Sequence, residues 1–159
     1  MKKLAAILSM VLCLFLTGCN NEFAKKEYDD LSKIVSNNDR YSQTMAVRKT
    51  SSSGFSLDIG GFDGRYSAFN YFSDSDCEMI YNLTFELGSG TAKIVFVDAL
   101  GNAVTLAERD ASGNDAEGVV TKNGILQLKK GRNSFKLVGY DVKNVKAEFS
   151  MSDVGEIER

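Results

Sequence analysis

The chain contains no histidine, no tryptophan and no proline among its 159 residues. Without His, Ser-His-Asp and Cys-His catalysis and every His-ligated metal site are excluded. No spacing of carboxylates singles out a pair for acid–base chemistry either, so we expect no enzyme. Without Trp the chain lacks the best stacking platform for sugars and cations. Without Pro, every backbone N–H is available to a β-sheet ladder.

The first residues have the composition of a secretory signal. Lys2 and Lys3 precede an almost unbroken apolar run from Leu4 to Leu16. A helix that spans a bilayer needs about 20 apolar residues, so this run is too short to be a membrane span. A short basic start followed by an apolar stretch of this length is typical of a signal peptide.

The apolar run ends in a four-residue motif, Leu16-Thr17-Gly18-Cys19. This motif resembles the lipobox of bacterial lipoproteins. The resemblance implies cleavage between Gly18 and Cys19 and attachment of diacylglycerol to the Cys19 sulfur. It predicts a signal peptide over 1–18 and a protein anchored by lipid at the outer face of the bacterial cytoplasmic membrane, with a Gram-positive source favoured.

Of the three cysteines, Cys13 would leave with the signal and Cys19 would be acylated, so only Cys77 remains. No disulfide within the chain is then expected. Asp76 and Glu78 flank Cys77 and disfavour its thiolate, which predicts an ordinary unpaired thiol. The formal charge of −2 becomes more negative when the two lysines of the signal are removed. Such a surface argues against nucleic acid as a partner.

The segment after the anchor is expected to be helical. Apolar residues recur at helical spacing from Glu22 to Ser36, namely Ala24, Tyr28, Leu31 and Val35. Two interpretations remain open. The helix is either part of a tether over 19–44 that separates membrane and domain, or it packs on the domain through this narrow stripe.

From about Met45 the pattern changes to the alternation of half-buried strands. In 79–87 the odd positions are apolar, while Asn82, Thr84 and Glu86 face the other way; 145–151 repeats the pattern with Glu148 and Ser150 on the polar side. Turn signals at 88–90, 101–102 and 130–131 separate such runs. We therefore predict an all-β domain over 45–152, a β-sandwich or jelly roll of eight to ten antiparallel strands, and a tail over 153–159. A chain beginning at Met45 is expected to fold by itself.

Two segments resemble the jelly-roll domains of carbohydrate-binding modules and small Gram-positive lipoproteins similar to them. One is 90–98 with Gly101 and Asn102 after it, and the other is 128–137. The likeness covers roughly residues 79–151. It implies the fold and permits a non-catalytic, surface-displayed module that binds glycan. The alternative is a protein-interaction or structural component of the cell envelope with no small ligand.

The stretch 62–72 is the richest in aromatic residues. A sugar presents apolar C–H faces and a rim of hydroxyls, so its site needs rings beside hydrogen-bonding groups. An aromatic strand is equally typical of a sandwich core, and that interpretation is favoured. If the domain binds a glycan, the predicted contact residues are Asp63, Arg65, Tyr66, Asn70 and Tyr71.

Two charged groups complete the candidates. Acidic side chains at alternate positions have the oxygen chemistry of a calcium site, but a solvated strand entry explains them better, and no metal or other cofactor is predicted. Basic side chains on an expected hairpin tip suit anionic lipid or wall polymer, although a solvated turn is favoured. These groups are Asp74, Asp76 and Glu78, and Lys129, Lys130 and Arg132.

Overall fold

A computed structural model describes residues 22–111 and 118–153. The predicted signal peptide, its cleavage site and Cys19 lie outside these residues, as does most of the predicted tail. The described residues form two short helices and six antiparallel strands, which are α2 (Glu22–Glu27), α3 (Leu31–Ile34), β1 (Arg40–Thr50), β2 (Gly54–Ser73), β3 (Cys77–Val97), β4 (Ala103–Asp110), β5 (Val119–Leu128) and β6 (Gly131–Asp153). Neither helix is long and apolar enough to cross a membrane.

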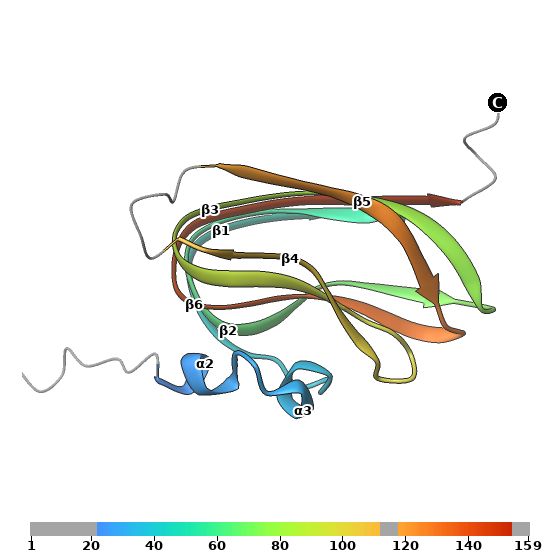
Figure 1. Cartoon of the computed structure of the whole chain (residues 1–159), viewed down its shortest axis with the longest axis horizontal. Helices are drawn as coiled ribbons and strands as arrows, with labels where there is room; N and C mark the ends of the chain where they lie inside the picture. The colour runs from blue at the N-terminus through green and yellow to red at the C-terminus, as the bar shows by residue number, and fades with distance from the viewer. Residues whose placement is uncertain (1–21, 112–117, 154–159) are drawn as a thin grey trace, which may run out of the picture.

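The strands form a β-sandwich because β2, β3 and β6 bend and pass through both of its layers (Figure 1). The first layer contains β1, β5 and the segments 54–62, 77–89 and 142–153. The second contains β4 and the segments 64–73, 91–97 and 131–139. With the three long strands counted once in each layer, the sandwich has nine strand segments. The predicted all-β sandwich of antiparallel strands is confirmed.

The bends occur where the backbone adopts a positive φ. Gly64 in β2 has φ +113° and Gly90 in β3 has φ +86°, and the pairing register with β6 shifts at both places. On β6 the residues at the bend are Asp141 and Asn144, with φ 56° and 51°. Asp and Asn tolerate this left-handed region better than other side chains that have a Cβ. The chain can therefore change layers without ending a strand.

The core between the two layers is rich in phenylalanine. Phe135 is fully buried, and its ring centroid lies 4.3 Å from that of Phe149 and 5.1 Å from that of Phe96. Phe55 and Phe69 join the same cluster. Tilted arrangements at such distances stabilise aromatic pairs beyond the burial of their area. The layers are thus held together by side-chain packing.

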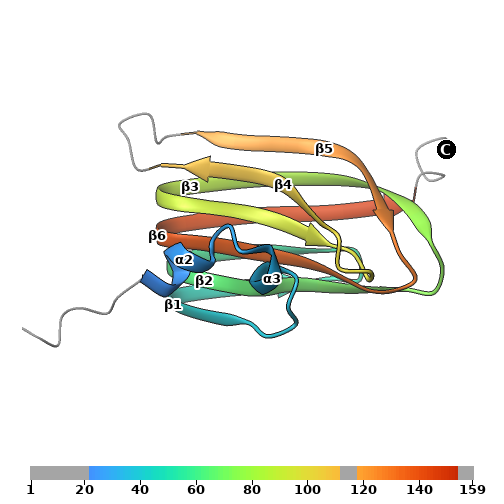
Figure 2. The same ribbon diagram turned by 60° about the horizontal axis from the view of Figure 1, so that its bottom comes forward.

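Residues 22–39, the N-terminal helical segment, contain two short helices instead of the single helix expected over 22–36. Asp30 interrupts the helix because its side chain accepts the backbone N–H of Lys33 at 3.3 Å and so caps α3. Tyr28 and Ile34 pack against Val138 and neighbouring valines of the second layer. Helices α2 and α3 lie over the outside of that layer (Figure 2). In the structure the helical segment therefore packs on the domain. Strand β1 also begins earlier than Met45, at Arg40.

Candidate functional site

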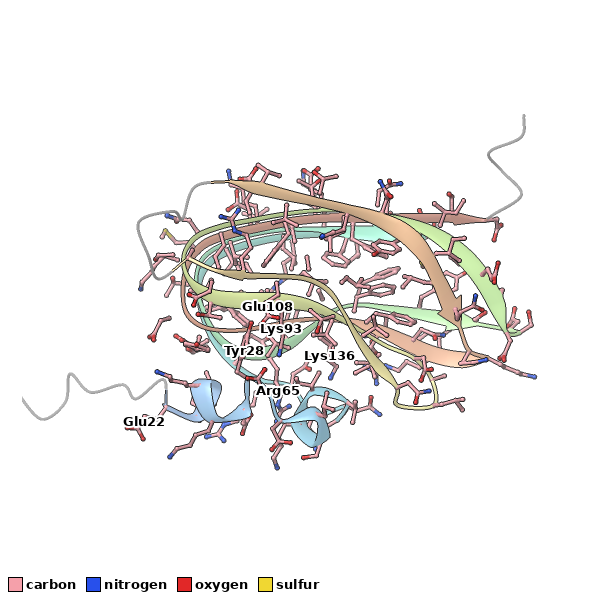
Figure 3. The ribbon with its side chains drawn as sticks, viewed as in Figure 1. Glu22, Tyr28, Arg65, Lys93, Glu108 and Lys136 are labelled. Atoms are coloured by element: carbon pink, nitrogen blue, oxygen red, sulfur yellow. The ribbon has the colours of Figure 1, made fainter. Side chains whose placement is uncertain are left out.

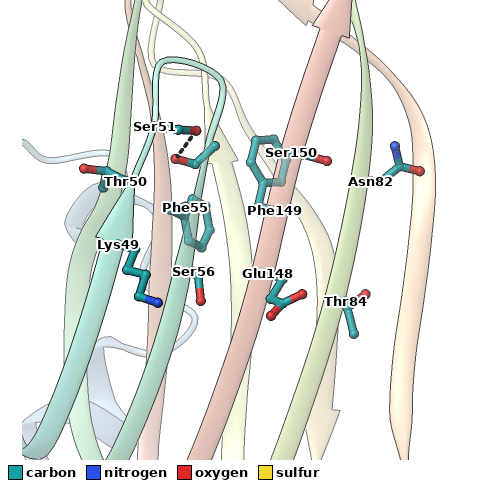
Figure 4. A pocket seen from close by; sticks show the side chains of 11 residues that line it. Lys49, Thr50, Ser51, Phe55, Ser56, Asn82, Thr84, Glu148, Phe149 and Ser150 are labelled. Atoms are coloured by element: carbon teal, nitrogen blue, oxygen red, sulfur yellow. Dashed lines mark hydrogen bonds between the residues drawn. The ribbon is translucent and has the colours of Figure 1, made fainter.

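A groove of about 400 Å³ lies on the first layer, on the side away from the helices. One row of side chains crosses it through the pairs Lys49–Ser56, Ser56–Glu148 and Glu148–Thr84, which bring four strands together. The next row contains Ser150 and Asn82 (Figure 4). The full lining is Lys49, Thr50, Ser51, Gly54, Phe55, Ser56, Asn82, Thr84, Glu148, Phe149 and Ser150.

The groove is hollow because the side chains at its centre are small. Gly54 lies where β2 approaches β6 closely, and a Cβ placed there would be 2.1 Å from the carbonyl oxygen of Phe149. Ser56 leaves further space between Lys49 and Glu148, and Ser150 leaves space in the next row. The alternation of a strand sends its polar side chains to the wet face of the sheet, which explains the polar lining.

The chemistry of the groove is that of a hydrogen-bonding surface. It offers hydroxyl groups, the amide of Asn82, the carboxylate of Glu148 and the ammonium of Lys49. Phe55 and Phe149, its two aromatic residues, are each only 4% exposed and belong to the core, so neither offers an open ring face. A ligand here would be held through its polar groups.

Two residues of the predicted glycan site are engaged within the fold. Arg65 is buried; its Nε donates to Glu27 Oε2 at 3.1 Å and its Nη1 donates to the carbonyl oxygen of Asn38. Asp63 accepts the backbone N–H of Asp141 at 2.7 Å. Burial raises the pKa of Asp63, although this hydrogen bond opposes the shift. Both residues therefore tie β2 to neighbouring segments.

The other three predicted residues also lie on β2 but have different surroundings. Tyr66 lies beside the guanidinium of Arg48, whose Cζ is 4.3 Å from the ring centroid. Tyr71 packs against the core between the layers. Asn70 accepts hydrogen bonds from two residues of β6 on the second layer. The structure does not gather the five residues in one pocket, and their role in binding a ligand stays a prediction.

Three buried cations, Arg65, Lys93 and Lys136, lie between the helical segment and the second layer (Figure 3). Each is paired with a carboxylate of the helical segment. Besides the Arg65–Glu27 pair, Lys93 Nζ lies 2.7 Å from Asp29 Oδ1, and Lys136 Nζ lies 3.8 Å from Asp39 Oδ1. The cations are buried, whereas the side chain of Asp29 is 85% exposed and that of Asp39 is 25% exposed, so the pairs connect buried charges of the second layer to the surface.

Burial lowers the pKa of Lys136; nearby Arg65 and Arg132 act in the same direction, and Asp39 opposes them. Tyr28, in the middle of the segment, donates its hydroxyl to Glu108 Oε1 at 2.7 Å. Burial, followed by that hydrogen bond, raises the pKa of Tyr28. The helical segment is thus fixed to the second layer by polar as well as apolar contacts.

The acidic group at 74–78 has a structural partner. Asp76 accepts Lys129 Nζ and the backbone N–H of Lys130, both at 2.8 Å. Hydrogen bonds to its ionised form, first that from Lys129, lower the pKa of Asp76. Within 22–111 and 118–153 no three Asp, Glu, Cys or His side chains are grouped to hold a metal ion. Cys77 is half-buried, with its Sγ 3.5 Å from Ser73 Oγ.

No family model matches the sequence, and no curated protein matches it. Among solved structures, a carbohydrate-binding module of Cellvibrio mixtus lichenase 5A, in complex with cellotriose, is 13% identical over 72% of this chain and 90% of its own, with a TM-score of 0.37. A family 35 carbohydrate-binding module from Clostridium thermocellum is 12% identical over 72% and 92%, with a TM-score of 0.38. An exo-β-1,3-galactanase of Phanerochaete chrysosporium, with galactose, is 18% identical over 70% and 29%, with a TM-score of 0.35. Scores below 0.5 at such identities assign no ligand to this chain.

Proposed function

We propose that the protein is a lipid-anchored, extracytoplasmic binding module that takes a glycan in the groove of the first layer. The observation that carries the proposal is the groove itself. Side chains from four adjacent strands supply it with hydroxyl, amide, carboxylate and ammonium groups. A ligand rich in hydroxyl groups is the chemical complement of that lining.

The sheet gives this site a fixed geometry. Neighbouring strands lie about 4.8 Å apart, a spacing comparable with the width of a sugar ring, and the register places Glu148 between Ser56 and Thr84. Groups on a rigid sheet lose little freedom when a ligand binds, which favours affinity. Since the groove has no open aromatic ring, hydrogen bonds must supply most of the affinity, and weak binding is expected.

Substitutions in the groove are expected to weaken glycan binding without unfolding the protein. Removing the carboxylate in Glu148→Ala should weaken affinity about tenfold or more, since a hydrogen bond to a charged group contributes about 1.5–3 kcal/mol. Thr84→Ala should weaken it about threefold. Oligosaccharide titration followed by NMR, or affinity electrophoresis, measures both effects.

Thr105→Ala is the matched control, because it makes the same chemical change on β4 of the second layer. It should leave the affinity unchanged. Equal losses from Thr84→Ala and Thr105→Ala would contradict the location of the site. If the wild-type protein binds no oligosaccharide, the glycan proposal fails and the protein-interaction alternative is favoured. The exposed Met45 and Val47 on edge strand β1 would then be the candidate contact surface for a protein partner.

The position of the helical segment supports an outward-facing groove on an anchored protein. Helix α2 begins at Glu22, three residues after Cys19. A peptide reaches at most about 3.5 Å per residue, so α2 would start within roughly 10 Å of the lipid. The helices cover the second layer and the groove lies on the first (Figure 1). The anchored protein would therefore direct its groove away from the bilayer.

Cys19→Ala is expected to abolish retention on the membrane. Each buried CH₂ of an acyl chain contributes about 0.8 kcal/mol, and two or more chains hold a protein far more firmly than one. Membrane fractionation of cells measures the effect. Cys77→Ala is the control and should stay in the membrane fraction, because Cys77 belongs to the folded domain. A Cys19→Ala protein that is processed normally and still pellets with membranes would refute the anchor.

A further inference from the structure

A second hollow, of about 360 Å³, lies at one end of the second layer and is separate from the groove. Three segments far apart in the sequence meet there: the residues after α3, the turn between β3 and β4, and the turn between β5 and β6. We name it the end pocket. Its lining is Val35, Asn37, Val97, Asp98, Ala99, Leu100, Gly101, Lys130, Gly131, Arg132 and Ser134.

Arg132 is held in the end pocket by a partner behind it. Its Nε donates to Asn70 Oδ1 at 3.0 Å, and the same oxygen accepts the hydroxyl of Ser134 at 2.8 Å. One amide on β2 thereby orients two polar side chains of β6. In the part of the chain that the structure describes, no partner engages the Nη1 and Nη2 groups of Arg132. A planar guanidinium with both terminal nitrogens available matches the two oxygens of a carboxylate.

The charges around the end pocket favour an anion. Lys130 is exposed, and its neighbour Lys129 already neutralises Asp76. Asp98 is the acidic residue of the lining, and its carboxylate accepts hydrogen bonds from the backbone of its own turn and from Asn102. The end pocket therefore has two cations against one engaged carboxylate.

The remaining wall of the end pocket is apolar. Val35 and Val97 form its base beside the packed N-terminal segment. Leu100 stands at its mouth and is 72% exposed. A bare inorganic anion would leave this apolar surface in water, whereas a ligand with an apolar body would cover it.

From these contacts we infer that the end pocket binds a small organic carboxylate with an apolar body. Arg132 and Lys130 bind the carboxylate, and Val35, Val97 and Leu100 cover the apolar part. Asn70 is a positioning residue, because it touches Arg132 and Ser134 and lies outside the lining. The site is independent of the groove and of the glycan proposal.

Titration with matched probes tests the charge requirement. N-acetyl-leucine and N-acetyl-leucinamide share their apolar body and differ in the carboxylate, and inorganic phosphate supplies an anion with no apolar part. We expect N-acetyl-leucine to shift the backbone NMR signals of 98–101 and 130–134 and to bind at least tenfold more tightly than either other probe. Equal binding of acid and amide, tighter binding of phosphate, or no binding of any probe would overturn the inference.

Substitutions locate the site. Arg132→Gln removes the charge while keeping an amide able to donate to Asn70, and it should weaken N-acetyl-leucine binding at least tenfold. Lys146→Gln, on the exposed face of the first layer, is the matched control and should have no effect. If Arg132→Gln does not fold, Lys130→Gln replaces an exposed side chain and should weaken binding severalfold. Unchanged affinity in a folded Arg132→Gln, or in Lys130→Gln, would contradict the assignment.

Discussion

Gly90→Ala is expected to destabilise the protein by about 3 kcal/mol or more, whereas Gly101→Ala should cost only about 1–2 kcal/mol. The two glycines have nearly the same φ, +86° and +85°. They differ in the space around them. A Cβ on Gly90 would lie 2.2 Å from the carbonyl oxygen of Asp141, while a Cβ on Gly101 would meet nothing within 4 Å.

Comparing the two glycine variants therefore separates two contributions to the loss of stability. Gly101→Ala measures the strain of a left-handed conformation for a residue with a Cβ. Gly90→Ala adds a clash with the β6 backbone at the point where β3 and β6 pass from one layer to the other. Urea denaturation of both variants and the wild type gives the two free energies of unfolding. Equal losses would mean that the β6 backbone moves away from the added Cβ at little cost, so that the clash contributes nothing beyond the strain of the positive φ.

The same bend shows why strand periodicity predicted the fold class but not the length of the strands. Gly88-Ser89-Gly90 reads as a hairpin turn between two strands, yet in the structure β3 continues through it from Cys77 to Val97. A glycine with positive φ serves a turn and a bend equally well, so the local sequence does not separate them. The turn at Gly101 was predicted correctly, since β3 reverses there into the neighbouring strand β4. The hairpin expected at Gly131 is wrong, because β5 pairs with β3 in the first layer and the chain crosses at Gly131 to β6 in the second layer.

The sequence predicted the polar faces of two strands that line the groove, but not that these faces meet. Alternation placed Asn82 and Thr84 on the polar side of one strand, and Glu148 and Ser150 on the polar side of another. Their meeting depends on the pairing of β3 with β6 across more than 60 residues of chain, which no local pattern encodes. The partners of Arg65 are equally distant, since Glu27 precedes it by 38 residues. A charged residue in an aromatic strand therefore suggested a ligand contact, where the structure has an ion pair.

From the sequence a chain beginning at Met45 is expected to fold by itself, but the packing of the N-terminal segment on the second layer leads us to expect that such a chain loses much of its stability. Such a chain lacks α2, α3 and the first residues of β1, and it leaves Val95, Val97 and Val138 uncovered. Burial of Tyr28 and Ile34 alone is worth roughly 3–6 kcal/mol at about 1.5–3 kcal/mol for each large side chain. The total free energy of unfolding of a domain this size is about 5–15 kcal/mol.

Urea denaturation followed by circular dichroism should therefore show residues 45–159 unfolded, or unfolding at a much lower urea concentration than residues 20–159. Tyr28→Ala in the longer chain tests the mechanism with a single change. It removes the ring that packs on Tyr140 and lies 4.0 Å from Lys93 Nζ, together with the hydrogen bond to Glu108, and should cost about 3–5 kcal/mol. Leu31→Ala is the control, since Leu31 is 63% exposed, and should change stability little. Equal midpoints for the two chains would make the helical segment a passive tether, because a segment that can be removed without cost cannot hold the second layer.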